Sequence, residues 1–413
     1  MLFKKPKPHW AVPATERLLL SVVVINVALT VAAEVLANYS GTSLIGKDFF
    51  TYLLAPVGQF DDFYGSLPNS SPASLTSLNG YVFPPISAIF YGSLALLPTT
   101  PFDLRLFVFQ LISILLFLAA IRVWTGIKES ATLALFTYPV LFCFFRGNNE
   151  LIQVSIFFIS LKAFEKRRET AGTITATINQ LLEFSPLLFL ISKPWHRRRF
   201  VLVAQTSVIS IMMLWLFRPD VNLLDYVNNL YQYLSAHSNP DKIWILYNNS
   251  IWNLFSYLDY LLFRLGLPEI LVPNSSMVGV GLLGISTALL VLVLQRGNLI
   301  DQMITGISLW LLVPAYSFDY RLTYLVIPLL LVSKDLTSYT RRIQALLLIL
   351  LVSPKHLLHI PSTMAWPVGG TENGILNPLL LIILILITSG SVTKNCFTHS
   401  SRGVAESWDL PQK

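Results

Sequence analysis

Long apolar runs recur along the chain and are separated by polar segments. The first run, residues 18–37, has about 20 residues, which is the length that a helix needs to cross the hydrocarbon core of a bilayer. About 12 runs are candidate spans on this criterion: 18–37, 82–97, 104–121, 131–145, 151–164, 174–191, 201–217, 277–294, 303–316, 322–332, 343–358 and 375–387. The pattern predicts an all-α, polytopic integral membrane protein with some short or re-entrant segments, forming one transmembrane domain over residues 1–413.

Polar residues form two long segments, 38–80 and 218–276, and a tail at 393–413. A basic cluster at positions 4–7 precedes the first span, whereas 38–80 contains a single basic residue, Lys47. Basic residues accumulate on the cytoplasmic side of membrane proteins, so both termini are expected inside and the two long segments outside. We expect the outer segments to carry interfacial helices and the tail to be cytoplasmic.

Two topologies of the middle of the chain remain open at this stage. A series of simple crossings places the basic cluster at 162–168 outside and the next cluster, at 193–199, inside, which the charge rule disfavours. The alternative makes 173–191 a re-entrant hairpin, because the run is broken at Glu183-Phe184-Ser185-Pro186 and proline ends a helix. Both clusters then lie inside, and a compensating half-span is required between 82 and 121.

Composition excludes a soluble cytosolic enzyme. Hydrophobic residues make up 54% of the chain and charged residues only 12%, where a soluble domain has about a quarter. The net charge of +7 is therefore expected to report orientation and contact with anionic lipid headgroups rather than a nucleic-acid partner. The two cysteines, Cys143 and Cys396, are far apart and match no metal or disulfide spacing, and no metal site is predicted.

Carboxylates and aromatic residues mark the first outer segment, notably Asp48, Tyr52, Asp61 and Asp62. A carboxylate shortly after a first span can act as a general base at the membrane surface, beside an aromatic platform for a lipid or sugar. The alternative is an interfacial helix that Asp48 caps and the aromatic side chains anchor. Asp61 and Asp62 either bind sugar hydroxyls or a divalent ion, or are simply solvated.

Short motifs follow one another along the chain in a characteristic order. They are Asp48-x-x-x-Tyr52, Tyr81-x-x-Pro84-Pro85, Arg146-Gly147-Asn148-Asn149, Tyr247-Asn248-Asn249-Ser250 and Ser317-Phe318-Asp319-Tyr320-Arg321. In order and spacing they resemble the polyprenyl-phosphate-sugar-dependent glycosyltransferases of the GT-C superfamily. The most similar group is glycosyltransferase family 87, which contains the mannosyltransferases of bacterial phosphatidylinositol mannosides.

The resemblance implies an inverting transfer of a hexose, such as mannose, from a polyprenyl-phosphate donor to a lipid or glycan acceptor. The reaction is expected at the extracytoplasmic face of a membrane, and the resemblance favours a bacterial plasma membrane. Asp48 takes the place of the catalytic base, and Arg146 and Arg321 suit the donor phosphate. The expected substrate contacts are Tyr52, Asp61, Asp62, Arg146, Asn149, Asn249, Tyr320 and Arg321. No cofactor is expected besides the donor substrate, and a need for a divalent metal stays open.

A multi-pass transporter or lipid flippase is the alternative function. Such a protein is expected to concentrate ionisable residues at mid-membrane and to contain paired broken helices. In this sequence the acidic residues cluster in the outer segments, which favours the enzyme.

Overall fold

The structure is a computed structural model, and it describes residues 28, 90, 93–94, 96–98, 104–126, 134–182, 201–209, 212, 249–268, 270–271, 275–314, 317, 319–353 and 373–406. Over these residues the chain is helical and contains no strand, as the apolar pattern predicts. The elements are α3 (Leu104–Thr125), α5 (Tyr138–Arg146), α6 (Glu150–Glu165), α7 (Glu169–Leu182), α10 (Ile251–Arg264), α11 (Ser275–Arg296), α12 (Leu299–Leu312), the 3-10 helix η5 (Asp319–Leu325), α13 (Val326–Ser333), α14 (Tyr339–Val352) and α15 (Asn373–Glu406).

Three of the described helices are long and apolar enough to cross a membrane. These spans are Leu104–Thr125, Met277–Arg296 and Gly374–Lys394, and they coincide with the predicted runs 104–121, 277–294 and 375–387. The predicted total of about 12 spans stays a prediction, because much of the chain lies outside the described residues.

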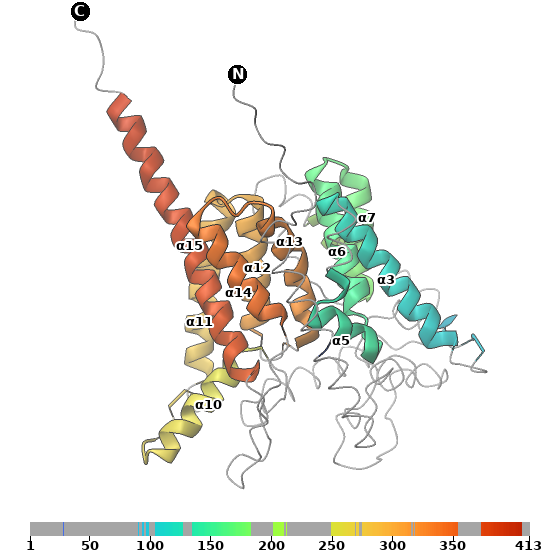
Figure 1. Ribbon diagram of the computed structural model, residues 1–413, viewed down its shortest axis with the longest axis horizontal. Coiled ribbons are helices and arrows are strands. Elements are labelled where there is room, and N and C mark those ends of the chain that lie inside the picture. Colours follow the sequence, from blue (N-terminus) through green and yellow to red (C-terminus); the bar gives the residue numbers. More distant parts are fainter. Residues whose placement is uncertain are drawn as a thin grey trace, which may run out of the picture.

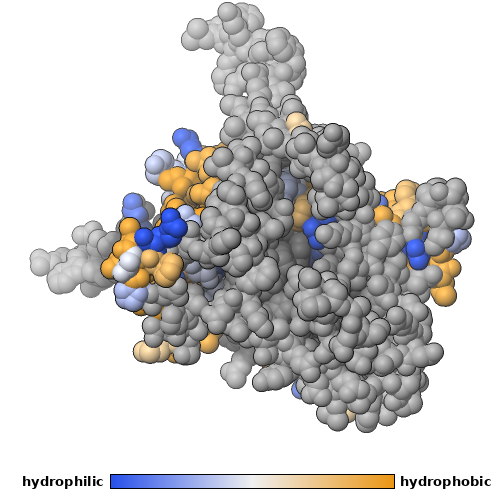
Figure 2. Space-filling view, turned by 90° about the horizontal axis from the view of Figure 1, so that it is seen from below, coloured by the Kyte–Doolittle hydropathy of each residue, from blue (hydrophilic) through white to orange (hydrophobic). Residues whose placement is uncertain are grey.

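The long helices are apolar on the faces that point away from the bundle as well as on those that point into it. On α3, Phe107, Leu111 and Leu115 are exposed, whereas Phe117 and Ile121 are fully buried. Figure 2 shows such hydrophobic side chains on both flanks of the molecule. A helix that is apolar all round belongs in the core of a large protein or in lipid, and exposed apolar faces favour lipid.

The short helix η5 lies at the centre of the described part and contacts α5, α6, α12, α13 and α14. Its Tyr324 is buried between two aromatic rings from different helices. The ring centroids lie 5.6 Å from Phe157 of α6 and 4.9 Å from Trp310 of α12. Aromatic edge contacts of this kind join the group α3, α5, α6 and α7 to the group α10–α15 (Figure 1).

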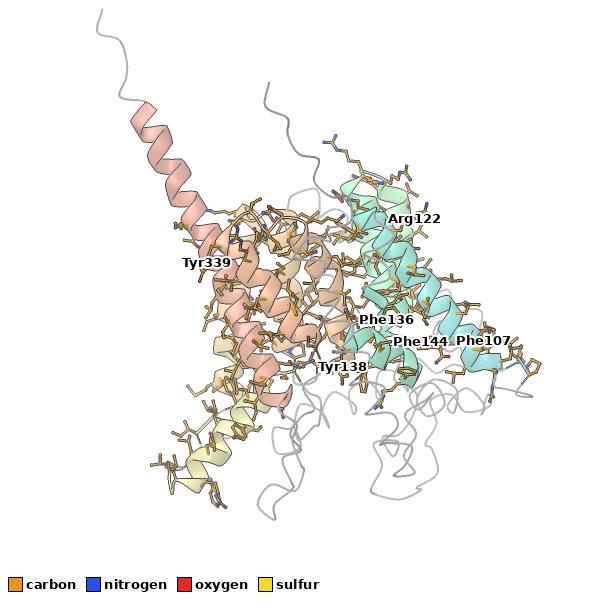
Figure 3. All side chains as sticks on the ribbon, viewed as in Figure 1. Phe107, Arg122, Phe136, Tyr138, Phe144 and Tyr339 are labelled. Atoms are coloured by element: carbon orange, nitrogen blue, oxygen red, sulfur yellow. The ribbon has the colours of Figure 1, made fainter. Side chains whose placement is uncertain are left out.

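Helix termini gather at two ends of the bundle. α3, α6, α11 and α13 finish at one end, where α7, α12 and α14 begin (Figure 1). Figure 3 labels Arg122 and Tyr339 at this end, and Phe107 and Phe144 at the other.

Basic side chains concentrate at the end where α3, α6 and α11 finish, which we call the basic end. Its described lysines and arginines include Arg122, Lys162, Lys166, Arg167, Arg168, Arg296, Lys334, Arg341, Arg342 and, on α15, Lys394. The other end, called the site end below, has fewer: Arg105, Arg146, Arg264 and Arg321. This asymmetry matches the distribution that positive-inside charge rules describe.

The described helices disagree with a series of simple crossings through the middle of the chain. That topology puts Arg146 and Arg321 on opposite sides of the membrane, yet Arg321 contacts Glu150, four residues after Arg146, over 3.2 Å. The turn at 166–168 also lies at the same end as Arg296. Both facts agree with the alternative topology, whose second basic cluster, at 193–199, falls outside the described residues.

Buried polar groups connect helices at the basic end. Arg341 of α14 donates from Nη1 to Oδ1 of Asp301 on α12, over 2.8 Å. Gln344 donates from Nε2 to Oγ1 of Thr388 on α15, over 3.0 Å. Each of these residues is at least nine-tenths buried, so the network is shielded from solvent and holds three helices in register.

The C-terminal helix is longer than the sequence pattern predicts. Its apolar run ends near 387, and the segment from 393 was expected to be a polar tail, but α15 continues to Glu406. The residues from 388 to 406 contain no proline, and the helix continues through Gly390 although glycine has a low helix propensity.

Candidate active site at one end of the bundle

An ion pair between Glu150 and Arg321 is the central feature of the site end. Nε of Arg321 donates to Oε1 of Glu150 over 3.2 Å. The side chain of Glu150 is 3% exposed and that of Arg321 is 21% exposed. A carboxylate that is buried to this extent requires a partner, and here the partner comes from a distant part of the chain.

Trp310 of α12 packs against the guanidinium of Arg321. The Cζ atom of Arg321 lies 5.1 Å from the centroid of the Trp310 ring, within the range of a cation–π contact. Since Trp310 also contacts Tyr324, the arginine is held by α12, by α6 and by its own helix η5. Three elements therefore fix the position of one positive charge.

A tight turn between α5 and α6 places Glu150. Gly147 has φ 66 and ends α5, with its N–H and that of Asn148 bonded to carbonyls of Phe144 and Cys143. This is a Schellman cap, in which glycine is preferred because the left-handed conformation is strained for other residues. Oδ1 of Asn148 then accepts from the backbone N–H of Glu150 over 2.9 Å, an Asx turn that leads into α6.

A second cluster at the site end joins the start of α10 to α15. The backbone N–H of Asn249 donates to the carbonyl of Ser317 over 2.6 Å, and Nδ2 of Asn377 donates to Oδ1 of Asn249 over 2.7 Å. All three residues are fully buried. Among the described residues no acceptor lies within hydrogen-bond distance of Nδ2 of Asn249. We use polar break for a short polar segment that interrupts the apolar helices. The cluster holds the polar break before η5 against α10 and α15.

Comparison with known proteins identifies the family. The model of glycosyltransferase family 87 matches residues 81–315, which is more than half of the chain. The chain belongs to glycosyltransferase family 87. No curated protein and no solved structure matches it.

Membership of family 87 makes the chain a glycosyltransferase and gives no support to the transporter alternative. The matched region contains two of the three polar breaks that meet at the site end, those at 146–149 and 247–250. The third, at 317–321, lies just beyond the match; its Ser317 contacts Asn249 of the second, and its Arg321 contacts Glu150, the residue directly after the first. Residues of the family region and of its immediate C-terminal neighbour thus meet at the site end of this family 87 protein.

Four of the predicted site residues lie at the site end, near the Glu150–Arg321 pair or in the second cluster. Asn149 is buried in the α5–α6 turn and Asn249 is in the second cluster. Arg146 ends α5 and lies over the ring of Phe142, with 5.2 Å from Cζ to the centroid. Tyr320 belongs to η5, beside Arg321.

The predicted catalytic base and three other predicted contacts fall outside the described residues. They are Asp48, Tyr52, Asp61 and Asp62. Within the described part no group of three potential metal ligands comes together. The predicted roles of these four residues stay predictions.

Sequence reasoning missed Glu150, Trp310 and Asn377. Glu150 had a signal: it is a carboxylate at the start of an otherwise apolar run and follows Asn148 and Asn149 directly. An ionisable residue in such a place requires a partner. Trp310 and Asn377 are isolated in apolar helices, and only the packing of α12 and α15 reveals their contacts.

Proposed function

We propose that this family 87 glycosyltransferase transfers a hexose, such as mannose, from a polyprenyl-phosphate donor to a lipid or glycan acceptor at the extracytoplasmic face of the membrane. The observation that carries the proposal is the Glu150–Arg321 pair at the site end, where the polar breaks of the chain meet. In this reading Arg321 binds the phosphate that leaves the sugar, and Glu150 is a positioning residue that orients Arg321.

A cation held in advance suits a leaving phosphate. Negative charge develops on the phosphate oxygen as the sugar departs, and a donor that is already oriented stabilises it without reorganisation. Arginine is well suited to phosphate because its planar guanidinium presents several N–H groups. The contacts with Glu150 and Trp310 reduce the freedom of that guanidinium before any substrate binds.

The depth of the pair favours a lipid-linked donor. Glu150 precedes Lys162 of the basic end by three helical turns and lies roughly 18 Å from it along α6, at 1.5 Å per residue. A bilayer core is about 30 Å thick, so with the basic end at one interface the pair lies below the other interface. A phosphate on a polyprenyl chain reaches this depth from within the membrane.

Charge distribution supports an extracytoplasmic site. The basic end is the cytoplasmic side under the positive-inside rule, which puts the site end on the outer side, where the same rule applied to the sequence expects the segments 38–80 and 218–276. Asp48, in the first of these segments, then acts as the general base. It removes the proton of the acceptor hydroxyl while that oxygen attacks the anomeric carbon, and the polyprenyl phosphate departs with inversion.

A transfer assay tests the proposal. Membranes containing the full chain are given either a radiolabelled polyprenyl-phosphate hexose or the matching nucleotide sugar. The enzyme that makes the polyprenyl-phosphate hexose from the nucleotide sugar is inhibited, so that neither donor is converted into the other. We expect label in the lipid or glycan fraction only with the polyprenyl-phosphate donor. Transfer from the nucleotide sugar alone would overturn the proposed donor, and absence of transfer from polyprenyl-phosphate mannose or glucose would overturn the proposed substrate class.

A further inference from the structure

The turn between α6 and α7 has an arginine where comparable turns of this chain have glycine. α5 and α10 each end in a Schellman cap whose left-handed residue is a glycine, Gly147 with φ 66 and Gly266 with φ 72. α6 ends in the same hydrogen-bond pattern, but its left-handed residue is Arg167, with φ 58. Among the described residues Arg167 is the one non-glycine residue with positive φ.

Backbone hydrogen bonds define this turn fully. The N–H of Arg168 bonds to the carbonyl of Ala163 over 2.9 Å, and that of Arg167 bonds to the carbonyl of Phe164 over 3.0 Å. Glycine satisfies this geometry without strain, whereas a side chain in the left-handed region is unfavourable. Strained positions of this kind occur where the side chain has a function, so the arginine side chain itself requires an explanation.

Three consecutive basic side chains project from the turn. Lys166, Arg167 and Arg168 are all exposed. Lys162, one turn earlier on α6, is directed instead to the protein, where it pairs with Glu165 and lies 4.4 Å from the centroid of the Trp124 ring. Glu165 and Glu169 flank these residues and are also exposed, but Glu165 pairs with Lys162, so the tip of the α6–α7 hairpin keeps an excess of positive charge.

An exposed apolar stripe begins directly beneath these charges. Ala171, Ile174 and Ile178 lie on one face of α7, at helical spacing, and are exposed. Ile174 is 55% and Ile178 43% exposed, which is high for isoleucine in a folded protein. The hairpin thus presents cations at its tip and apolar side chains along its shaft.

The tip lies beyond the last turn of α3, one of the candidate membrane spans. Trp124, in the last turn of α3, donates from Nε1 to the carbonyl of Phe158 on α6, and Lys334 donates to the carbonyl of Thr125. Because Phe158 lies seven residues before the end of α6, the tip of the hairpin extends roughly 10 Å past the end of α3, at 1.5 Å per residue. In a bilayer this is the headgroup zone, with acyl chains alongside the shaft of α7.

We propose that the α6–α7 hairpin binds an anionic phospholipid. The phosphate of the headgroup contacts Lys166, Arg167 and Arg168, and an acyl chain lies along Ala171, Ile174 and Ile178. Consecutive cations attract an anionic headgroup strongly, and the apolar stripe adds contacts that a soluble anion lacks. The inference does not depend on the proposed transfer reaction, which takes place at the other end of the bundle.

Lipid binding by the purified full-length protein tests this inference. The protein in a neutral detergent is titrated with phosphatidylglycerol or phosphatidylcholine, and bound lipid is counted by native mass spectrometry. We expect phosphatidylglycerol to be preferred, and the triple variant Lys166→Gln, Arg167→Gln, Arg168→Gln to weaken its binding by on the order of tenfold. The matched control replaces two other exposed cations of the basic end, Arg296→Gln and Arg342→Gln, and should keep the preference.

A second variant separates lipid binding from turn structure. Arg167→Gly relieves the left-handed strain and removes one charge, so its melting temperature without added lipid should equal or exceed that of the wild type, while its preference for phosphatidylglycerol falls severalfold. Three outcomes would each overturn the inference. The triple variant could bind phosphatidylglycerol as well as the control does, Arg167→Gly could keep its preference unchanged, or inorganic phosphate could compete fully. The inference would also be overturned if the hairpin bound an acidic protein and showed no preference between phosphatidylglycerol and phosphatidylcholine.

Discussion

Nε of Arg321 lies 3.2 Å from Oε1 of Glu150, and this bond joins residues that are 171 positions apart in the chain. The pair connects the turn after α5 to the polar break before α13, so two segments that each interrupt apolar helices face each other at the site end. Paired charges of this kind inside a membrane protein mark functional positions more often than structural ones, because leaving them in lipid is costly.

Replacing Arg321 tests its contact with the donor. A hydrogen bond to a charged group contributes about 1.5–3 kcal/mol, so Arg321→Ala should raise the KM for the polyprenyl-phosphate hexose by about 10- to 100-fold. Initial rates at varied donor concentration measure this change. Arg264→Ala is the matched control, because Arg264 is an exposed arginine at the same end of the bundle and should leave the KM unchanged. Unchanged kinetics in Arg321→Ala would remove this residue from the site.

Glu150 should act on the donor through Arg321. Glu150→Gln keeps an oxygen acceptor but removes the charge, so the guanidinium is less firmly oriented, and kcat/KM for the polyprenyl-phosphate donor should fall. A double-mutant cycle provides the test: Glu150→Gln should have little further effect on kcat/KM in the Arg321→Ala background. Additive losses would mean that Glu150 works independently of Arg321.

Local patterns predicted α3, α11 and α15 correctly because a span of about 20 apolar residues has few alternatives in a membrane protein. The short elements were harder, since hydropathy does not distinguish the nine-residue α5 or the seven-residue η5 from part of a span. Their boundaries depend on the turn at Gly147 and on contacts with other helices.

The candidate site was predictable only in part. The motifs at 146–149, 247–250 and 317–321 could be read from the sequence, and the structure brings residues of all three to one end. The hydrogen-bond or ion-pair partner of each residue could not be read from the sequence. Arg321 pairs with Glu150, which is 171 positions away in the chain, because the packing of α6 against η5 decides which charges meet.

The buried pair of Asp301 and Arg341 should stabilise the fold rather than the reaction. Both residues are nearly buried at the basic end, and removing one partner leaves an uncompensated charge, which typically costs about 3–5 kcal/mol. Arg341→Met should therefore lower the melting temperature in detergent markedly, and the double variant Asp301→Leu, Arg341→Met should recover much of the loss. The variant Arg342→Met, at an exposed neighbour, is the control and should melt like the wild type. No recovery in the double variant would contradict this account.

Sidedness can be measured with single cysteines in a Cys396→Ser background, where the remaining Cys143 is buried. Leu265, at the site end, and Thr170, at the basic end, are both exposed. In intact cells Leu265→Cys should react with a membrane-impermeant thiol reagent, and Thr170→Cys should react only after permeabilisation, because the basic end is expected inside. The reverse pattern would place the site end in the cytoplasm and contradict the proposed extracytoplasmic reaction.

Asp48 remains the proposed general base, and its amide variant tests that role directly. Asp48→Asn keeps the size and polarity of the side chain but cannot accept the acceptor proton, and such proton transfer typically contributes about 10² to 10⁴ in rate. Turnover should therefore fall by that order, while the melting temperature and the binding of the polyprenyl-phosphate donor are preserved. Asp61→Asn and Asp62→Asn are the controls, since both belong to the same outer segment.

If Asp48→Asn kept most of the activity and one of the controls abolished it, the base would be the residue changed in that control. A loss of folded protein in Asp48→Asn alone would instead support the helix-cap interpretation, because a cap stabilises its helix whether or not substrate is bound.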